Sequence, residues 1–255
     1  MRSDGVQVWT ARPDRLDAGA CSQFLCVLDH EERDRARRLH CEADRVAFIT
    51  AHALRRIALG VTMAVDPQEL RFSTGAHGQP ILLDAPAHAP RFSLSRSRGL
   101  VAVALGHGTP VGVDVEAVRD GVDGSLLEPF MALAPGELGD DIDFYSRWTA
   151  LEAFWKARGL GLSTAHPRIR LQPLADECWE VLFDGGERRG AGTVVMRLPC
   201  EATHVLALAC DEPVPVRMVE LEGLARLAAA HPQEALSSCK DRDCDVAAAP
   251  SMFSQ

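Results

Sequence analysis

The sequence feature that most restricts the fold is the stretch 110–116, in which apolar and polar residues alternate. Its apolar positions are Val111, Val113 and Val115. A period of two is typical of a β-strand with one apolar face, and alternate side chains of a strand point to the same side. Asp114 and Glu116 should therefore share a face, about 6.5–7 Å apart, with Gly112 leaving room for a ligand. The pair suits a hard cation such as Mg²⁺, although on its own the solvated face of an edge strand is the better interpretation.

The composition argues against several classes of protein. The chain has 255 residues, of which 47% are hydrophobic, enough for one large domain or two smaller ones. No apolar run reaches the ~18 residues of a membrane span, and the start of the chain lacks a signal peptide's apolar core. We therefore expect a cytoplasmic protein that does not enter a membrane. The eight cysteines are scattered without zinc-site spacing, and the net charge of −9 argues against a general nucleic-acid binder.

Periodicity and turn residues predict a mixture of helices and strands. Helices are expected at 28–40, 44–59, 126–133, 141–158 and 219–230. Strands are expected at 6–9, 91–95, 100–105, 110–116, 169–171, 179–183, 192–198 and 204–209, with a hairpin at 72–83. The second helix should end at Gly60. The segment 231–255 has no periodicity and is expected to be a disordered tail.

The helix expected at 141–158 carries a carboxylate on an aromatic face. The aromatic residues at helical spacing on that face are Tyr145, Trp148 and Trp155. Glu152 lies among them, where a charge is costly without a partner. One interpretation is an ion pair with Lys156, one turn further on. The other is that Glu152 adds a third carboxylate to Asp114 and Glu116, while Lys156 reaches a phosphate.

Arginines and histidines in the first half of the chain allow two interpretations. Arg35, Arg38 and Arg45 lie on the two expected N-terminal helices and are most simply solvated. They could instead form a phosphate-binding edge, because guanidinium groups bind phosphate in a bidentate manner. The loop histidines are expected at the surface: His77, His88 and His107.

Three blocks of the sequence resemble the Sfp-type 4′-phosphopantetheinyl transferases in order and spacing. The blocks are Phe92–Ser95, Val111–Glu116 and Trp148–Gly161. Gly-x-Asp-x-Glu alone is a weak signal, but it is strong when joined to Trp-Thr-x-x-Glu-Ala-x-x-Lys-x-x-Gly-x-Gly at this distance. The segments Glu31-Glu32-Arg33, Asp44-Arg45 and Leu54-Arg55 are also similar to the family's first helices, so the similarity covers about residues 9–209.

The resemblance implies an α+β fold built as a pseudo-dimer of two similar halves, with the active site in the cleft between them. The halves would be residues 1–109 and 110–230. It also implies an enzyme that transfers the 4′-phosphopantetheine of coenzyme A to a serine of an acyl or peptidyl carrier protein, releasing 3′,5′-ADP. We expect it to act as a monomer.

The resemblance further implies roles for individual residues. Mg²⁺ would be held by the residues that match the family's metal ligands: Asp114, Glu116 and Glu152. Glu152 would also accept the proton of the carrier serine, and Lys156 would contact the phosphates. Coenzyme A would be contacted at four further positions: Arg45, Gln79, Ser95 and Arg96.

Three positions depart from the family pattern. Gln79 replaces the lysine of Gly-Lys-Pro, Arg96 replaces the histidine of Ser-His, and Leu151 replaces the lysine of Lys-Glu. Because the carboxylates and Lys156 are present, we expect an active transferase. The alternatives are a non-catalytic relative that binds coenzyme A or a carrier protein, and an unrelated metal-dependent phosphotransferase.

Overall fold

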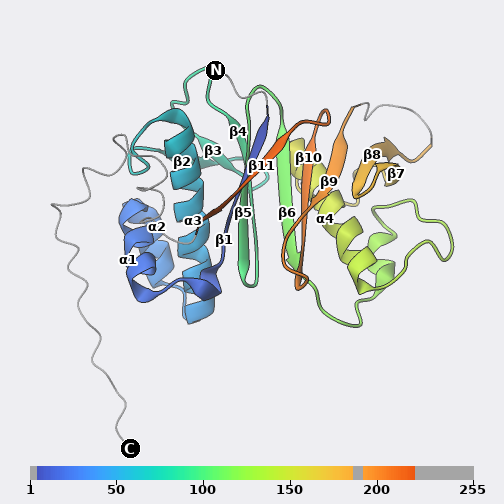
Figure 1. Cartoon of the computed structure of the whole chain (residues 1–255), viewed down its shortest axis with the longest axis horizontal. Coiled ribbons are helices and arrows are strands. Elements are labelled where there is room, and N and C mark those ends of the chain that lie inside the picture. The colour runs from blue at the N-terminus through green and yellow to red at the C-terminus, as the bar shows by residue number, and fades with distance from the viewer. Residues whose placement is uncertain (1–4, 186–191, 222–255) are drawn as a thin grey trace, which may run out of the picture.

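The computed structural model describes residues 5–185 and 192–221 and has a mixed α+β fold (Figure 1). One sheet has the strand order β11-β1-β5-β4, and a second has the order β6-β10-β9-β8-β7. The strands of the first sheet are β1 (Val6–Ala11), β4 (Arg91–Ser97), β5 (Leu100–Gly106) and β11 (Val216–Leu221). Those of the second are β6 (Val111–Ala117), β7 (Ile169–Ala175), β8 (Cys178–Phe183), β9 (Val194–Leu198) and β10 (His204–Cys210). The predicted hairpin forms from β2 (Phe72–Thr74) and β3 (Pro80–Leu82).

Helices cover the outer face of each sheet (Figure 1). The first sheet is covered by α1 (Ala18–Val27), α2 (His30–Arg37) and α3 (Glu42–Met63). The second is covered by α4 (Asp141–Ala157). Two short 3₁₀ helices complete the secondary structure of the described residues: η1 (Pro13–Arg15) and η2 (Gly124–Leu127).

Three hydrophobic cores follow from this layering. The first joins α1, α2 and α3 to the first sheet and includes Phe24, Leu54, Ile57 and Val103. The second joins α4 to the second sheet and includes Leu151, Phe154, Val195 and Ala207. The third lies between the two sheets and includes Val8, Ala102, Val113 and Leu206. Because β5 contributes alternate residues to two cores, all seven of its residues are buried.

The helix α3 is longer than predicted because Gly60 is an internal residue. The helix continues to Met63, and Ala64 then takes the left-handed conformation with φ 55°. A Cβ at Gly60 would lie 2.8 Å from the Pro67 ring, so the glycine allows the following segment to fold back closely. By length and composition α3 could cross a membrane, but 67% of its apolar window is buried and it packs on the first sheet as a core helix.

Other predicted elements also need correction. The helix predicted at 28–40 is α2, which begins after Asp29 because the Asp29 carboxylate accepts a hydrogen bond from the Glu32 N–H. The separate helix α1 was not predicted. The helix predicted at 126–133 is reduced to η2, and the helix predicted to begin at Val219 is wrong because 216–221 is strand β11. Residues 222–230 and the predicted tail at 231–255 lie outside the described residues.

The last described strand returns to the first sheet. β11 pairs in parallel with β1, from Val6 opposite Val216 to Ala11 opposite Leu221. The chain therefore leaves the first sheet after β5, builds the second sheet, and comes back. The division of the chain at residues 109 and 110 stays a prediction, and β11 is the one described strand after that point that joins the first sheet.

A buried cluster of charges fixes the helices of the first half. Glu32 accepts hydrogen bonds from Arg55 at 2.6 Å and from Arg56 at 2.7 Å, and it contacts His52 at 2.9 Å. Burial alone would raise the pKa of Glu32, but His52 and the two arginines outweigh it and hold that pKa at about 2. Arg56 is fully buried and also donates to carbonyl oxygens of the segment 67–70. The cluster thereby ties α2 and α3 to the chain leading into the hairpin.

The helix α4 lies directly on β6 because Gly112 has no side chain. A Cβ at Gly112 would lie 1.9 Å from the Ala153 carbonyl oxygen and 2.5 Å from the Ala157 nitrogen. The expectation that Gly112 leaves room for a ligand is therefore wrong, because the space is filled by the α4 backbone. This close approach sets the position of Glu152 and Lys156 relative to Asp114.

We predict that Gly112→Ala lowers the free energy of unfolding by about 3 kcal/mol, the upper end of the range for overpacking, because the added methyl group meets backbone that cannot rotate away. Urea denaturation measures this change. Gly161→Ala is the matched control, since nothing lies within 4 Å of a Cβ at Gly161. Equal stability of the two variants would contradict this account of the contact between α4 and β6.

Candidate functional site

The two sheets meet along β4 and β6, where serine side chains take the place of a backbone ladder. Backbone N–H groups of β6 donate to serine hydroxyl oxygens of β4 at 3.0–3.3 Å. The donor and acceptor pairs are Val113 with Ser93, Val115 with Ser95, and Ala117 with Ser97. β6 is the edge strand of the second sheet, as predicted. The prediction that its acidic face is solvated is wrong, because Asp114 is buried and the serines of β4 cover that edge.

Asp114 is the most buried carboxylate along the contact between β4 and β6 (the seam), and it is paired with Lys156. The residue is 3% exposed. Its Oδ1 accepts hydrogen bonds from the Ser95 hydroxyl at 2.7 Å and from Lys156 Nζ at 2.6 Å. Of the two interpretations of Lys156, the i,i+4 ion pair with Glu152 is not the contact observed, because the described ion pair of Lys156 is with Asp114 on β6.

Asp114 lies close enough to Glu116 and Glu152 to raise the pKa of both. The Ser97 hydroxyl donates to Glu116 Oε2 at 2.9 Å. Burial raises the pKa of each of the three carboxyl groups. Repulsion from Asp114 raises the pKa of both glutamates further, and the positive charge of Lys156 opposes these shifts. Lys156 thus contacts Asp114 directly and lowers the pKa of all three carboxyl groups through its charge.

These residues fit a hard divalent cation in donor type and in charge. Asp114 Oδ2 is buried and has no hydrogen-bond partner in the described part of the chain. Carboxylate oxygens are the ligands that Mg²⁺ prefers, and a divalent cation would offset the burial and repulsion that raise the three pKa values. Among the described residues, no three His, Cys, Asp or Glu side chains are grouped closely enough to hold a metal ion as they stand.

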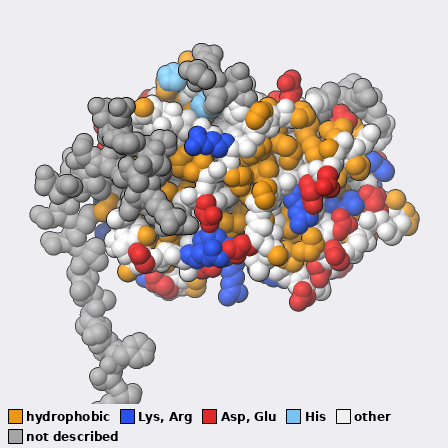
Figure 2. All heavy atoms as spheres, viewed as in Figure 1, with side chains coloured by type: hydrophobic (Ala, Val, Ile, Leu, Met, Phe, Trp, Pro, Cys, Tyr) orange, Lys and Arg blue, Asp and Glu red, His pale blue; other side chains and the backbone are white. Residues whose placement is uncertain are grey.

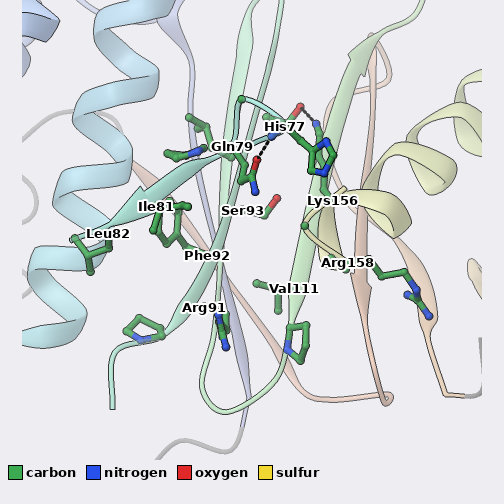
Figure 3. A pocket seen from close by; sticks show the side chains of 18 of the residues that line it. His77, Gln79, Ile81, Leu82, Arg91, Phe92, Ser93, Val111, Lys156 and Arg158 are labelled. Carbon is green, nitrogen blue, oxygen red and sulfur yellow. Dashed lines mark hydrogen bonds between the residues drawn. The ribbon is translucent and has the colours of Figure 1, made fainter. Parts of the chain in front are cut away.

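A cavity of about 1180 Å³ opens beside this cluster. Its walls come from α2, α3, the β2–β3 hairpin, β4, the start of β6 and the C-terminal end of α4. Figure 3 shows Gln79, Ile81 and Leu82 of the hairpin region on one side and Lys156 and Arg158 on the other. The strand residues Phe92, Ser93 and Val111 lie between these sides. Segments far apart in the sequence therefore share one pocket.

The pocket carries an excess of positive charge. Five cationic side chains line it: Arg35, Arg91, Arg96, Lys156 and Arg158. Two carboxylates, Glu152 and Asp211, belong to the same lining. The net charge of the chain is −9, and on the face shown in Figure 2 acidic and basic side chains are intermixed. The local excess of arginine and lysine suits an anionic ligand such as a polyphosphate.

Most of the predicted site residues meet at this pocket. Those that line it are Gln79, Ser95, Arg96, Glu152 and Lys156. Asp114 is outside the lining but contacts two lining residues, Ser95 and Lys156. Glu116 and its partner Ser97 are both outside the lining. Arg45 is outside the lining and pairs with Glu42 in the first turn of α3. Of the three arginines proposed as a phosphate-binding edge, Arg35 alone lines the pocket.

The three departures from the family pattern have different structural consequences. Gln79 Oε1 accepts a hydrogen bond from the backbone N–H of His77 at 3.0 Å, so this amide stabilises the turn of the hairpin. Arg96 is exposed and lines the pocket, where its charge helps to lower the pKa of His52, a shift caused mainly by burial. Leu151 is fully buried in the second core and does not replace a pocket cation.

Several residues of the site were not predicted. Ser97 falls outside the strand predicted at 91–95, although the period of two in Ser93, Ser95 and Ser97 is that of a longer strand. Arg158, which donates to Thr193 at 2.9 Å and stacks on Phe154, gave no pattern beyond a basic helix end. The loop residue His77 also lines the pocket and is exposed, as predicted.

We predict that Glu152→Gln stabilises the protein in the presence of a chelator at neutral pH. The raised pKa of Glu152 means that its charged form destabilises the fold; this cost is present above the folded-state pKa and absent below the unfolded-state value. The gain should be on the order of 1 kcal/mol, or about 2–4 °C in Tm. Thermal unfolding across pH 4–8 measures it, with the exposed Glu128→Gln as control. An equal gain at every pH would contradict the electrostatic explanation.

Sequence comparisons connect this site to a known family. The chain is 30% identical over 166 residues to slr0495 of Synechocystis sp., provisionally named a 4′-phosphopantetheinyl transferase. It is 29% identical over 173 residues to the 4′-phosphopantetheinyl transferase HetI of Nostoc sp., and 28% identical over 149 residues to the 4′-phosphopantetheinyl transferase Sfp of Bacillus subtilis. These alignments cover 62%, 64% and 55% of the chain.

The alignments reach 66%, 72% and 64% of the lengths of these relatives, just under two thirds for the Synechocystis and B. subtilis proteins. No family model matches the chain. These relatives carry the name of the family that the motif blocks along β4, β6 and α4 resemble. The chain is therefore similar to several proteins named 4′-phosphopantetheinyl transferases, over 55–64% of its length.

Proposed function

We propose that the protein transfers the 4′-phosphopantetheine group of coenzyme A to a serine hydroxyl of an acyl or peptidyl carrier protein. The observation that carries this proposal is the convergence of Asp114, Glu116, Glu152 and Lys156 beside a pocket lined by arginines. Phosphoryl transfer depends on positioning and on neutralising charge more than on covalent chemistry. A site made of converging carboxylates, one lysine and several arginines supplies both.

We also propose that the chain forms two similar halves, divided near residues 109 and 110, with β11 crossing back from the second half to the first sheet. The pocket would then be the cleft between the halves. Two observations support this arrangement: the sheets pack face to face through the third core, and the pocket is lined by residues from both sides of the division.

Within this proposal Asp114, Glu116 and Glu152 hold Mg²⁺. The ion, when bound, would neutralise charge on the pyrophosphate of coenzyme A. Lys156 lines the pocket, and its ammonium group is bound to Asp114. From this position it could also contact a phosphate of coenzyme A in the pocket. Movement of this ammonium from the carboxylate to a phosphate oxygen would free Asp114 Oδ1, beside the already unpartnered Oδ2.

In the transfer step, Glu152 would act as the base for the proton of the carrier serine. The serine oxygen of the carrier forms a bond to the β-phosphorus, the bond from that phosphorus to the bridging oxygen breaks, and 3′,5′-ADP leaves with the electron pair. Glu152 accepts the serine proton. The pKa of Glu152 is raised by burial and by the neighbouring carboxylates, which makes it a stronger base than an exposed glutamate.

Coenzyme A would be bound by the remaining pocket residues. Arg96 and Arg35 offer guanidinium groups to its phosphates and can replace the cation lost at Gln79. Ser95 would contact the same ligand. The role of Arg45 at the nucleotide end rests on the family resemblance alone. Carrier proteins are acidic, so the basic residues at the pocket mouth would favour their approach. We expect the enzyme to work as a cytoplasmic monomer.

The test is incubation of the protein with an apo-carrier protein, coenzyme A and Mg²⁺, followed by intact-mass analysis of the carrier. We expect the mass of one phosphopantetheine group to be added, with the rate reduced by ~10²-fold or more in Asp114→Ala and Lys156→Met. The exposed Glu128→Gln variant should match the wild-type protein. Folded protein that adds nothing to carriers of fatty-acid, polyketide and peptide type would contradict the proposal.

The position of Gln79 favours a second candidate function, binding without transfer. The amide of Gln79 is held by the turn of the hairpin, so the lysine contact of the family pattern is missing. A non-catalytic relative would bind coenzyme A or a carrier protein without transfer. Calorimetric binding of coenzyme A together with an unmodified carrier mass would support this second function.

A further inference from the structure

Three alternate serines of β4 contact β6, and one of them differs from the other two in its hydrogen bonds. Ser93, Ser95 and Ser97 each accept a backbone N–H from β6. Ser95 and Ser97 also donate their hydroxyl protons to carboxylates of β6, whereas Gly112 occupies the corresponding position beside Ser93. All three serines therefore accept a hydrogen bond from the β6 backbone, but only Ser95 and Ser97 also donate one to a carboxylate.

Ser97 is held between the backbone and Glu116. Its oxygen accepts from the Ala117 N–H at 3.0 Å, and its single proton is donated to Glu116 Oε2 at 2.9 Å. Since the N–H occupies the acceptor side of the hydroxyl, the proton is directed toward the carboxylate. This contact restricts rotation of the Glu116 side chain, which lies near the end of β6 where burial decreases.

We propose that Ser97 is a positioning residue that fixes Glu116 in the orientation in which it binds a divalent cation. The inference rests on the proposed function, because it takes Glu116 as a metal ligand. Hydrogen bonds to metal-binding carboxylates orient them before the ion arrives, and their loss weakens metal binding. Ser97 would not touch the cation, coenzyme A or the carrier protein.

The Ser93→Ala variant is the matched control. It removes the same type of seam contact, a serine oxygen that accepts a β6 N–H, from the same strand. Both Ser93→Ala and Ser97→Ala should therefore lower Tm in the metal-free protein. The two variants differ in one respect, because Ser97→Ala alone releases a carboxylate.

The experiment is a titration of the full-length protein with Mn²⁺ alone, without coenzyme A, with free Mn²⁺ measured by electron paramagnetic resonance. We expect Ser97→Ala to weaken Mn²⁺ binding by about 10-fold or more. Ser93→Ala should leave the Mn²⁺ affinity unchanged, and Ser97→Thr, which keeps the hydroxyl, should retain it.

Unchanged Mn²⁺ affinity in Ser97→Ala, or equal weakening in Ser93→Ala, would overturn this inference and leave the proposed function intact. A wild-type protein that binds no Mn²⁺ would overturn the proposed metal site, and the inference with it.

Discussion

The contact between Lys156 and Asp114 links the two structural elements on which the site depends. Lys156 is on α4, Asp114 is on β6, and their atoms are 2.6 Å apart in a place where Asp114 is almost fully buried. A buried carboxylate is costly unless it is paired. The pair is possible because Gly112 lets the α4 backbone lie on β6 without an intervening side chain. A larger residue at position 112 would move Lys156 and Glu152 away from the strand.

The charged residues of the site lower the stability of the fold. Three carboxylates with raised pKa values converge where the described side chains offer one ammonium group. An ordinary core would replace such a cluster with apolar residues at no loss. The cluster is consistent with the proposed function, in which a cation would neutralise the carboxylates and an anionic pyrophosphate would neutralise the arginines and lysine of the pocket. Strained electrostatics of this kind are typical of functional sites.

The part of the site that lies on β6 and α4 could largely be predicted from the sequence. The alternation at 110–116 placed Asp114 and Glu116 on one face, and helical spacing placed Glu152 and Lys156 on one side of α4. These patterns are local, so they survive folding. The partner of Lys156 could not be predicted, because spacing along one helix favours Glu152 while the observed partner comes from another element.

The prediction failed where tertiary contacts override local signals. Gly60 is a helix-ending residue by type, but in this fold it is the point where the Pro67 segment packs on α3. The apolar residues of 219–221 fit a helix by periodicity, yet they pair with β1, a strand more than 200 residues earlier in the chain. The role of Ser97 could not be predicted, because the partners of its hydroxyl, the Ala117 N–H and Glu116, belong to β6 of the other sheet.

The central claim is that the converging carboxylates bind a cation that in turn holds coenzyme A. Calorimetric titration of the protein with coenzyme A, once with Mg²⁺ and once with a chelator, tests this claim directly. The account predicts tighter binding with Mg²⁺ and loss of that difference in Asp114→Asn. Equal affinity under the two conditions in the wild-type protein would contradict it.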